Sequence, residues 1–444
     1  MTVVVLALLV GTFVVLGFTQ GPKLSSAQID VDGVVAQSGQ QLRLFANQAV
    51  ATVDAEQVTV TPDAAATVSS SGDVIAVQFD EPLNYGIRYT VEVRDVTSVY
   101  VDQPATFSYT FETGSPAIHY LDRASAGSDA DDEIIATRIL DTDRTVLFAA
   151  PRIQDYAEFD TATAVVTLGD DDLSELSLVN SQGNVEPLTL PGDGIIENLH
   201  ASQTGVLGFT FTSAGPTPER EFSDTLFSVD LNNSRIIQPV SGIDGNPMQV
   251  LDWEFIPVTG EIIAQSLDQS LFRLDPAVPG VILPLGQYLE FGTIASDGSA
   301  ITVADPFGQV ALSLVDGSIE RLDASPLDGV LPSGGAVQVL PSGDRIQRVA
   351  IFDSESGRFR SELVYDDGTQ SRELFGTIDD AGSIESFTVS PNSEYVAVET
   401  VPNVAASVSD GYPVGARSTT VTTVFVEIAT GAVIKSVEGF RPTW

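Results

Sequence analysis

Carboxylates are the most abundant side chains of this sequence that could do chemistry. The chain has 61 Asp and Glu, two His and no Cys. The densest acidic group is the run DADDE, with Asp129, Asp131, Asp132 and Glu133, and Asp170–Asp172 form a second group. Calcium accepts oxygen ligands alone, so the first group is a candidate calcium site. Neither group has the spacing of an EF-hand loop, and acids beside Gly and Ser are usually solvated turns, so we expect no cofactor.

Catalysis by His or by a strong nucleophile is disfavoured. His119 alternates with Ile118 and Tyr120 and is expected to be a strand residue, whereas His200 precedes a turn and could face a channel mouth. The sequence has no G-x-S-x-G, P-loop, G-x-G-x-x-G or H-E-x-x-H motif. The absence of Cys excludes disulfides and thiolate zinc sites. We therefore predict that the chain is not an enzyme.

The charge of the chain restricts its partners. Its formal net charge is −41, and Lys23 and Lys435 are its only lysines. Nucleic acids and anionic membrane surfaces are polyanions, so neither is an expected partner. The acidic composition suits a soluble body on a crowded exterior, or the surface of a halophile's protein.

An internal repeat indicates the architecture. Each copy has an apolar strand, a turn of Pro, Ser, Asp, Asn or Gly, and a second apolar strand; the copies are Val250–Leu274, Leu289–Leu314, Ala336–Val364 and Ile384–Val398. Repeats of this length are typical of propellers, because one unit cannot bury its apolar face alone. Seven candidate first turns have gaps of 39 to 55 residues, at Pro116, Asp160, Ser202, Pro257, Ser296, Pro341 and Pro391.

This spacing predicts a seven-bladed β-propeller over residues 116–444. The first unit begins at its turn, and the chain stops after Gly439–Trp444, which is similar to the strand opening another unit. We expect residues 439–444 to supply the innermost strand of the first blade and so to pair an open edge. Aromatic residues on the inner strands are expected to pack between blades; these are Trp253, Phe255, Phe291, Phe387 and Trp444.

Two further segments precede the propeller. Residues 27–113 carry short strands of alternating pattern with turns about every ten residues, which predicts a β-sandwich. Val3–Phe18 has no charge and no Pro, so residues 1–22 are expected to be a membrane anchor or a cleaved signal. Ser25 and Ala27 would mark a cleavage site before Gln28. The predicted fold is thus all-β, with an N-terminal hydrophobic helix, a sandwich and a propeller.

Short motifs resemble known families. Phe79–Leu83, Gly86–Val93 and Phe107–Thr113 resemble bacterial immunoglobulin-like domains of surface-layer and adhesin-type proteins. Ser390–Tyr395 resembles the Ser-Pro-Asp/Asn-Gly turn of TolB-type and WD-repeat-like propellers, although the Gly-His and Trp-Asp dipeptides are missing. The resemblance implies an exported envelope protein of the actinobacterial type, in which the sandwich is a spacer and the propeller contacts other proteins.

The favoured hypothesis is a non-catalytic envelope protein that binds another envelope or extracellular protein. We expect it to touch the membrane only through its N-terminal helix, with the rest of the chain outside the cell. Two loops insert residues that the repeat does not need, Ser213–Phe222 and Val401–Ser418. Their candidate binding residues are Arg220, Glu221, Asp410, Tyr412 and Arg417. The alternative is an extracellular enzyme that acts on a glycan or peptide at the central channel, which would require convergent carboxylates or a His there.

Overall fold

A computed structural model describes residues 21–444 apart from Pro116, Ala126, Gly127, Asp129, 216–220, Val258, Pro279, 354–357 and 378–380. The described residues are almost entirely β-structure, and their helical elements are single short turns. The apolar segment expected to form an N-terminal helix lies outside this part of the chain. Within the described ranges, no helix is long and apolar enough to cross a membrane.

Residues 24–112 form two sheets that share one core. The first sheet has the order β1 (Leu24–Gln28), β2 (Gln41–Ala46), β5 (Val74–Phe79) and β4 (Ala66–Ser71), the second has β3 (Val58–Thr61), β6 (Arg88–Val96) and β7 (Ala105–Glu112), and α2 (Gly33–Ala36) and η1 (Ala55–Gln57) lie in their connections. Alternation along β5 buries Ile75, Val77 and Phe79. These side chains pack with Val91 and Phe107 of the second sheet. The period of two therefore sets which faces meet.

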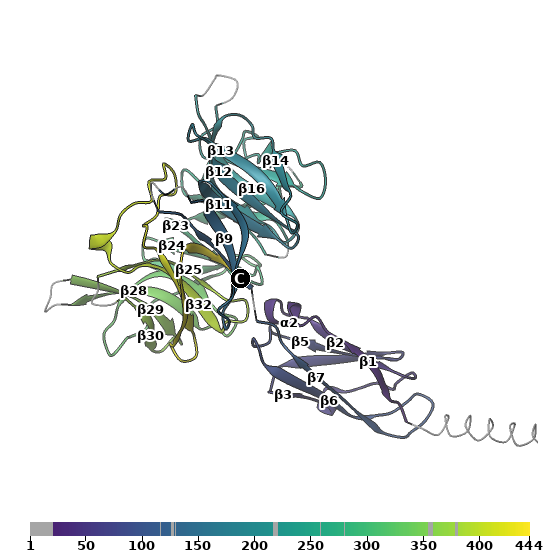
Figure 1. The fold of residues 1–444 in the computed structure, drawn as a ribbon. Helices are drawn as coiled ribbons and strands as arrows, with labels where there is room; N and C mark the ends of the chain where they lie inside the picture. Colours follow the sequence, from purple (N-terminus) through teal and green to yellow (C-terminus); the bar gives the residue numbers. More distant parts are fainter. Residues whose placement is uncertain are drawn as a thin grey trace, which may run out of the picture.

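The remaining described residues build seven four-stranded antiparallel sheets. At four junctions the first strands of neighbouring sheets contact one another, and the last strand along the described chain pairs into the first of these sheets (Figure 1). This arrangement is a β-propeller, which confirms the prediction from the repeat.

Six of these sheets use consecutive strands from the centre outward. Blade 2 has β11 (Ile153–Phe159), β12 (Ala162–Leu168), β13 (Ser174–Asn180) and β14 (Val185–Leu188), and blade 3 has β15 (Gly194–Ala201), β16 (Val206–Ser213), β17 (Thr225–Asp230) and β18 (Gln238–Pro239). Blade 4 has β19 (Val250–Phe255), β20 (Ile262–Ser266), β21 (Ser270–Leu274) and β22 (Ile282–Gln287), and blade 5 has β23 (Glu290–Ile294), β24 (Ala300–Asp305), β25 (Gly308–Ser313) and β26 (Ile319–Arg321). Blade 6 has β27 (Ser333–Val339), β28 (Arg345–Asp353), β29 (Arg358–Asp366) and β30 (Ser371–Gly376), and blade 7 has β31 (Ser383–Val389), β32 (Tyr395–Val401), β33 (Thr422–Glu427) and β34 (Val433–Glu438).

Blade 1 joins the two ends of this part of the chain. Its strands are β35 (Phe440–Thr443), β8 (Ala117–Asp122), β9 (Asp132–Arg138) and β10 (Arg144–Ala150). The C-terminal strand β35 pairs antiparallel with β8, with Phe440 opposite Leu121 and Thr443 opposite His119. Because β35 takes the innermost place, the ladder of β8 has no open edge toward the axis.

The innermost strand of every blade contains a register shift. A bulge leaves backbone groups without ladder partners, and those groups need others when they are buried. In blade 3, the buried Thr210 hydroxyl donates to the Glu197 carbonyl at 3.0 Å. In blade 5, the buried Thr302 hydroxyl accepts from the Thr293 amide at 2.9 Å. Polar side chains of the second strands thus supply hydrogen-bond partners to backbone groups that the bulges leave unpaired.

Alternating strand directions give the propeller two different faces. One face carries the connections between the second and third strands of each blade and the links between blades; we call it the loop face. The opposite face carries the turns between first and second strands, including Pro391–Ser393 of blade 7. The sandwich lies on this opposite face, where Glu81 and Pro82 approach the Pro391–Ser393 turn. Figure 1 shows it at the lower right of the propeller.

The sandwich and the propeller share a buried contact. The Tyr85 ring stacks on the Tyr395 ring with 6.1 Å between centroids. The Tyr85 amide donates to the Glu394 carboxylate at 2.7 Å, and the Asn392 side chain donates to the Leu83 carbonyl at 3.2 Å. Tyr395 belongs to the same apolar cluster as the sandwich core. The two parts are therefore held together by packing as well as by their covalent link.

Aromatic side chains fill the spaces between blades, as the sequence analysis expected of them. Trp253 is fully buried and lies edge-to-face with Phe255 at 5.1 Å. Its ring covers Gly208 of the neighbouring blade, where an added Cβ would lie 2.3 Å from the indole. Glycine is thus required at position 208 by the close approach of the ring rather than by backbone conformation.

We expect Gly208→Ala to lower the free energy of unfolding by about 1–3 kcal/mol, because the extra methyl overpacks the space against Trp253. Urea denaturation measures this change. Gly192→Ala is the control, because no atom lies within 4 Å of the added Cβ at that position. Equal stability of the two variants would contradict the proposed packing.

Candidate functional site

Three segments that are distant in sequence converge on the loop face. They are the β8–β9 connection, the β10–β11 turn with Pro151 and Arg152, and residues 402–421 between β32 and β33 of blade 7, which we call the strap. Together they line a cavity of about 440 Å³ that is open to solvent. Its lining includes Ser125, Ser128, Asp131, Arg152 and Tyr412.

Arg123, at the end of β8, fixes the strap at this place. Its guanidinium donates to Asp410 at 2.7 Å and to the Gly415 carbonyl at 3.1 Å, both in the strap. It also donates to the Ile153 and Gln154 carbonyls at the start of blade 2, at 3.1 and 2.7 Å. The side chains of Arg123 and Asp410 are 3% and 4% exposed. Four donors are thus used, which offsets the desolvation of this buried pair.

Two aromatic rings lie against the same guanidinium. The Tyr412 centroid lies 3.7 Å from the Arg123 carbon Cζ, and the Phe440 centroid lies 4.9 Å from it. Arg417 of the strap lies over the Phe440 ring at 5.2 Å. Cations and aromatic rings therefore alternate from the strap to the closing strand, in contacts that are strongest when desolvated.

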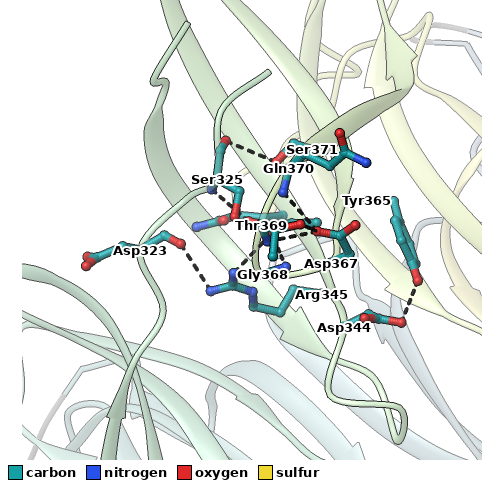
Figure 2. Close-up of polar contacts among 12 residues, drawn as sticks. Asp323, Ser325, Asp344, Arg345, Tyr365, Asp367, Gly368, Thr369, Gln370 and Ser371 are labelled. Carbon is teal, nitrogen blue, oxygen red and sulfur yellow. Dashed lines mark hydrogen bonds and ion pairs between the residues drawn. The ribbon is translucent and has the colours of Figure 1, made fainter. Parts of the chain in front are cut away.

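A second buried ion pair lies in blade 6 (Figure 2). Arg345 donates to Asp366 at 3.0 Å and to the Asp323 carbonyl at 3.1 Å. Asp366 also accepts the Ser325 and Gly368 amides at 2.9 and 2.7 Å. These contacts hold the link between blades 5 and 6 against blade 6. We interpret them as structural, because they fasten the connection at Asp323 and Ser325 to strands of blade 6.

Each of the two histidines lies beside a glutamate of the next blade; His200 is on the innermost strand β15, and His119 is on β8, the second strand of blade 1. His200 Nδ1 is 3.0 Å from the Glu254 carboxylate. His119 Nδ1 is 2.7 Å from Glu158, and the Thr443 hydroxyl donates to the same oxygen at 2.6 Å. Arg441 of β35 forms an ion pair with Asp155 at 2.9 Å and donates to the Leu199 carbonyl at 3.2 Å. The bulged inner strands thus bring acidic and basic groups to the axis.

The protonation of His200 and Glu254 is coupled. Burial acts to lower the pKa of His200, but attraction by Glu254 and the hydrogen bond to it together raise that pKa above its usual value. Burial acts to raise the pKa of Glu254, and the charge and hydrogen bond of His200 reverse this, so the pKa is lowered. Nearby, burial raises the pKa of Asp252 despite the His200 charge. We infer an ionised pair at the axis.

The structure brings together three of the five predicted binding residues. Asp410, Tyr412 and Arg417 all lie in the strap beside blade 1, but as its internal fastenings rather than as freely exposed groups. Glu221 is exposed on the loop of blade 3, away from these contacts. Arg220 lies outside the described residues.

The acidic run that suggested calcium is divided between different partners. Asp132 is buried and accepts the Ala124 and Ile153 amides, both at 2.8 Å, and the Tyr412 hydroxyl. Glu133 forms an ion pair with Arg144. Asp131 lines the cavity, and Asp129 lies outside the described residues. Within the described ranges, no group of three His, Asp or Glu side chains could hold a metal ion.

Sequence reasoning did not single out Arg123, Arg441 or the glutamates beside the histidines. Asp410 lies 287 residues from Arg123, so no local spacing could relate them. One signal was present: Arg441 stands in the segment that was expected to close the ring, where any charged side chain must face the axis or a neighbouring blade.

Comparison with known proteins supports no family. No family model matches the chain, and no curated protein matches it. Among solved structures, the β-propeller domain of the trilobed protease from Pyrococcus furiosus has a TM-score of 0.43 at 10% identity, over 80% of this chain and 98% of that one. A putative 6-phosphogluconolactonase from Bacteroides fragilis has 0.42 at 12% identity, over 74% and 96%. Pyrococcus horikoshii acylaminoacyl peptidase has 0.44 at 11%, over 70% of this chain and 51% of its own. Similarities this distant transfer no activity.

Asp410→Ala should lower the free energy of unfolding by about 3 kcal/mol, because it leaves the buried Arg123 charge without its carboxylate. Urea denaturation measures the loss, and limited proteolysis should show faster cleavage within the strap. Arg88→Ala is the matched control: it removes an exposed pair with Glu112, whose side chains are 73% and 60% exposed, and should change little. A strap that stays resistant in Asp410→Ala would contradict its fastening by Arg123.

His200→Gln should have a pH-dependent effect on stability. A raised folded pKa means that His200 stabilises the fold fully below its unfolded pKa of about 6.5 and loses that contribution as pH rises through the folded value. At low pH the stabilisation by the pair is lost only when Glu254 is protonated, and the lowered pKa of Glu254 moves that loss to more acidic pH. The free energies of unfolding of the wild type and of His200→Gln, measured across pH 5 to 9, should therefore approach each other toward high pH. A constant difference would rule out an ionised pair.

Proposed function

We propose that the chain is a non-catalytic binding protein of the cell envelope that presents the loop face of its propeller to a partner protein. The cavity beneath the strap is the observation that carries this proposal. Blades 1, 2 and 7 each contribute to it, and Arg123 fixes their arrangement before any ligand arrives. A preorganised concave site gains affinity because little ordering remains to be done on binding.

The organisation of the N-terminal part supports display away from a membrane. The sandwich at residues 27–113 acts in this proposal as an immunoglobulin-like spacer, and Val3–Phe18 as an uncleaved anchor. Cleavage before Gln28 would remove Leu24–Ala27, which are most of β1 and pair with β2. Retention of the N-terminal segment keeps this edge of the sandwich paired.

A specific observation favours a second candidate function. The two His–Glu contacts are the groups that a hydrolase acting on a glycan or peptide would need at the channel. The binding function is preferred because the Glu158 carboxylate is already bonded to both His119 and Thr443. In His200→Gln, loss of a measurable hydrolysis of envelope glycan or peptide would support the enzyme.

The absence of Cys allows a direct test of the binding face. Ser128→Cys places one thiol on the cavity wall, and Val315→Cys places one on a turn of the opposite face, where Val315 is 83% exposed. Both variants are labelled with a benzophenone maleimide, mixed with native envelope extract and irradiated. We expect a discrete protein adduct, identified by mass spectrometry, from position 128 alone.

Asp410→Ala in the Ser128→Cys background should weaken that adduct, because the strap is released from Arg123. The same adducts from both positions, or none from position 128, would contradict binding at the loop face.

A further inference from the structure

Two apolar side chains project from one end of the sandwich. Val99 is 57% exposed and Tyr100 is 77% exposed. Among the described residues of the sandwich, no other large apolar side chain is exposed to this degree. Adjacent exposed apolar residues in an otherwise well-buried domain indicate a surface that something covers.

The turn that carries them is rigidly held. The Ser98 amide donates to the Val101 carbonyl at 3.2 Å, and the Ser98 hydroxyl accepts the Tyr100 amide at 3.1 Å. The Val99 amide donates to the Ala49 carbonyl at 3.1 Å. Exposure of the two side chains is thus built into the turn and is not the result of an unsupported loop.

This turn lies where the apolar N-terminal segment reaches the sandwich. An added Cβ on Gly21 would lie 2.5 Å from the Gln103 carbonyl oxygen, so the described chain begins against the 97–103 turn. Only Thr19 and Gln20 separate Gly21 from Phe18, the end of the uncharged run. The uncharged run is therefore close in sequence to the residue that contacts this turn.

The chemistry of this end suits the boundary of a bilayer. Tyr is favoured at membrane interfaces, where its ring is buried and its hydroxyl stays hydrated. Between Thr97 and Gln103, Asp102 is the single charged residue, in a chain of net charge −41. Lys23, one of two lysines in the sequence, joins the same end through Asn47, whose amide donates to the Lys23 carbonyl at 3.0 Å.

We propose that Val99 and Tyr100 form a second membrane contact, inserted into the interfacial region of the bilayer that holds residues 3–18. This inference rests on the anchor in the proposed function. With two contacts, the sandwich stands on the membrane in a fixed orientation, and the propeller, which packs against Tyr85 and Leu83, is held in a defined direction from it.

The test uses the full chain in vesicles of phosphatidylcholine. Val99→Cys is labelled with the fluorophore NBD, and Val315→Cys with the same label is the control. Flotation of the labelled proteins with the vesicles first reports anchoring. Replacing the lipid by phosphatidylcholine with brominated chains should then reduce NBD emission about twofold at position 99, because interfacial groups lie about 5–10 Å into the headgroup and acyl boundary. Emission at position 315 should not change.

Each outcome separates the inference from the proposed function. Failure to float would overturn the anchor and this inference with it. Flotation without quenching at position 99 would leave the anchor in place and overturn the membrane contact. Emission that depends on protein concentration but not on brominated lipid would assign the turn to a second copy of the chain, which also overturns it. Adding Tyr100→Glu to the labelled Val99→Cys protein should abolish the quenching at an unchanged melting temperature.

Discussion

Closure of the ring is the constraint on which the rest of the propeller depends. Seven radial sheets leave an open ladder wherever the two ends of the chain meet, and β35 removes it by pairing with β8. Arg123 secures the same seam, because its guanidinium bonds to blade 2 and to the strap of blade 7 and lies against the rings of Phe440 and Tyr412. The loop-face cavity lies beside this seam and takes its shape from it.

The bulges near the axis explain how a very acidic chain can be stable at its centre. A bulged strand directs side chains toward the axis instead of into a neighbouring blade, and buried hydroxyls satisfy the backbone groups that the bulge leaves unpaired. The basic groups directed there are few and each is paired, as in Arg441 with Asp155 and His200 with Glu254. Most of the excess charge is left to the solvated turns, where water screens it.

The fold could be predicted from the sequence further than the site could. The propeller followed from repeated strand–turn–strand units, because turn residues such as Pro391 are local signals of backbone geometry. The immunoglobulin-like character of the sandwich stays a prediction. Loop insertions pointed to the strap, but Asp410 and Tyr412 turned out to fasten it to residues nearly three hundred positions away. Such partners follow from closure, which no local pattern contains. The His–Glu pairs were missed for the same reason.

The late position of β35 also has a consequence during synthesis. The strand it must join, β8, is made before every other propeller strand, whereas Phe440–Thr443 follow all of them along the described chain. Until then β8 keeps a free edge, and an unpaired edge is a template for aggregation. A product that stops between β8 and β35 would keep this edge unpaired. Proteases and chaperones could therefore distinguish a closed ring from an open one by a single feature, an exposed strand at the seam.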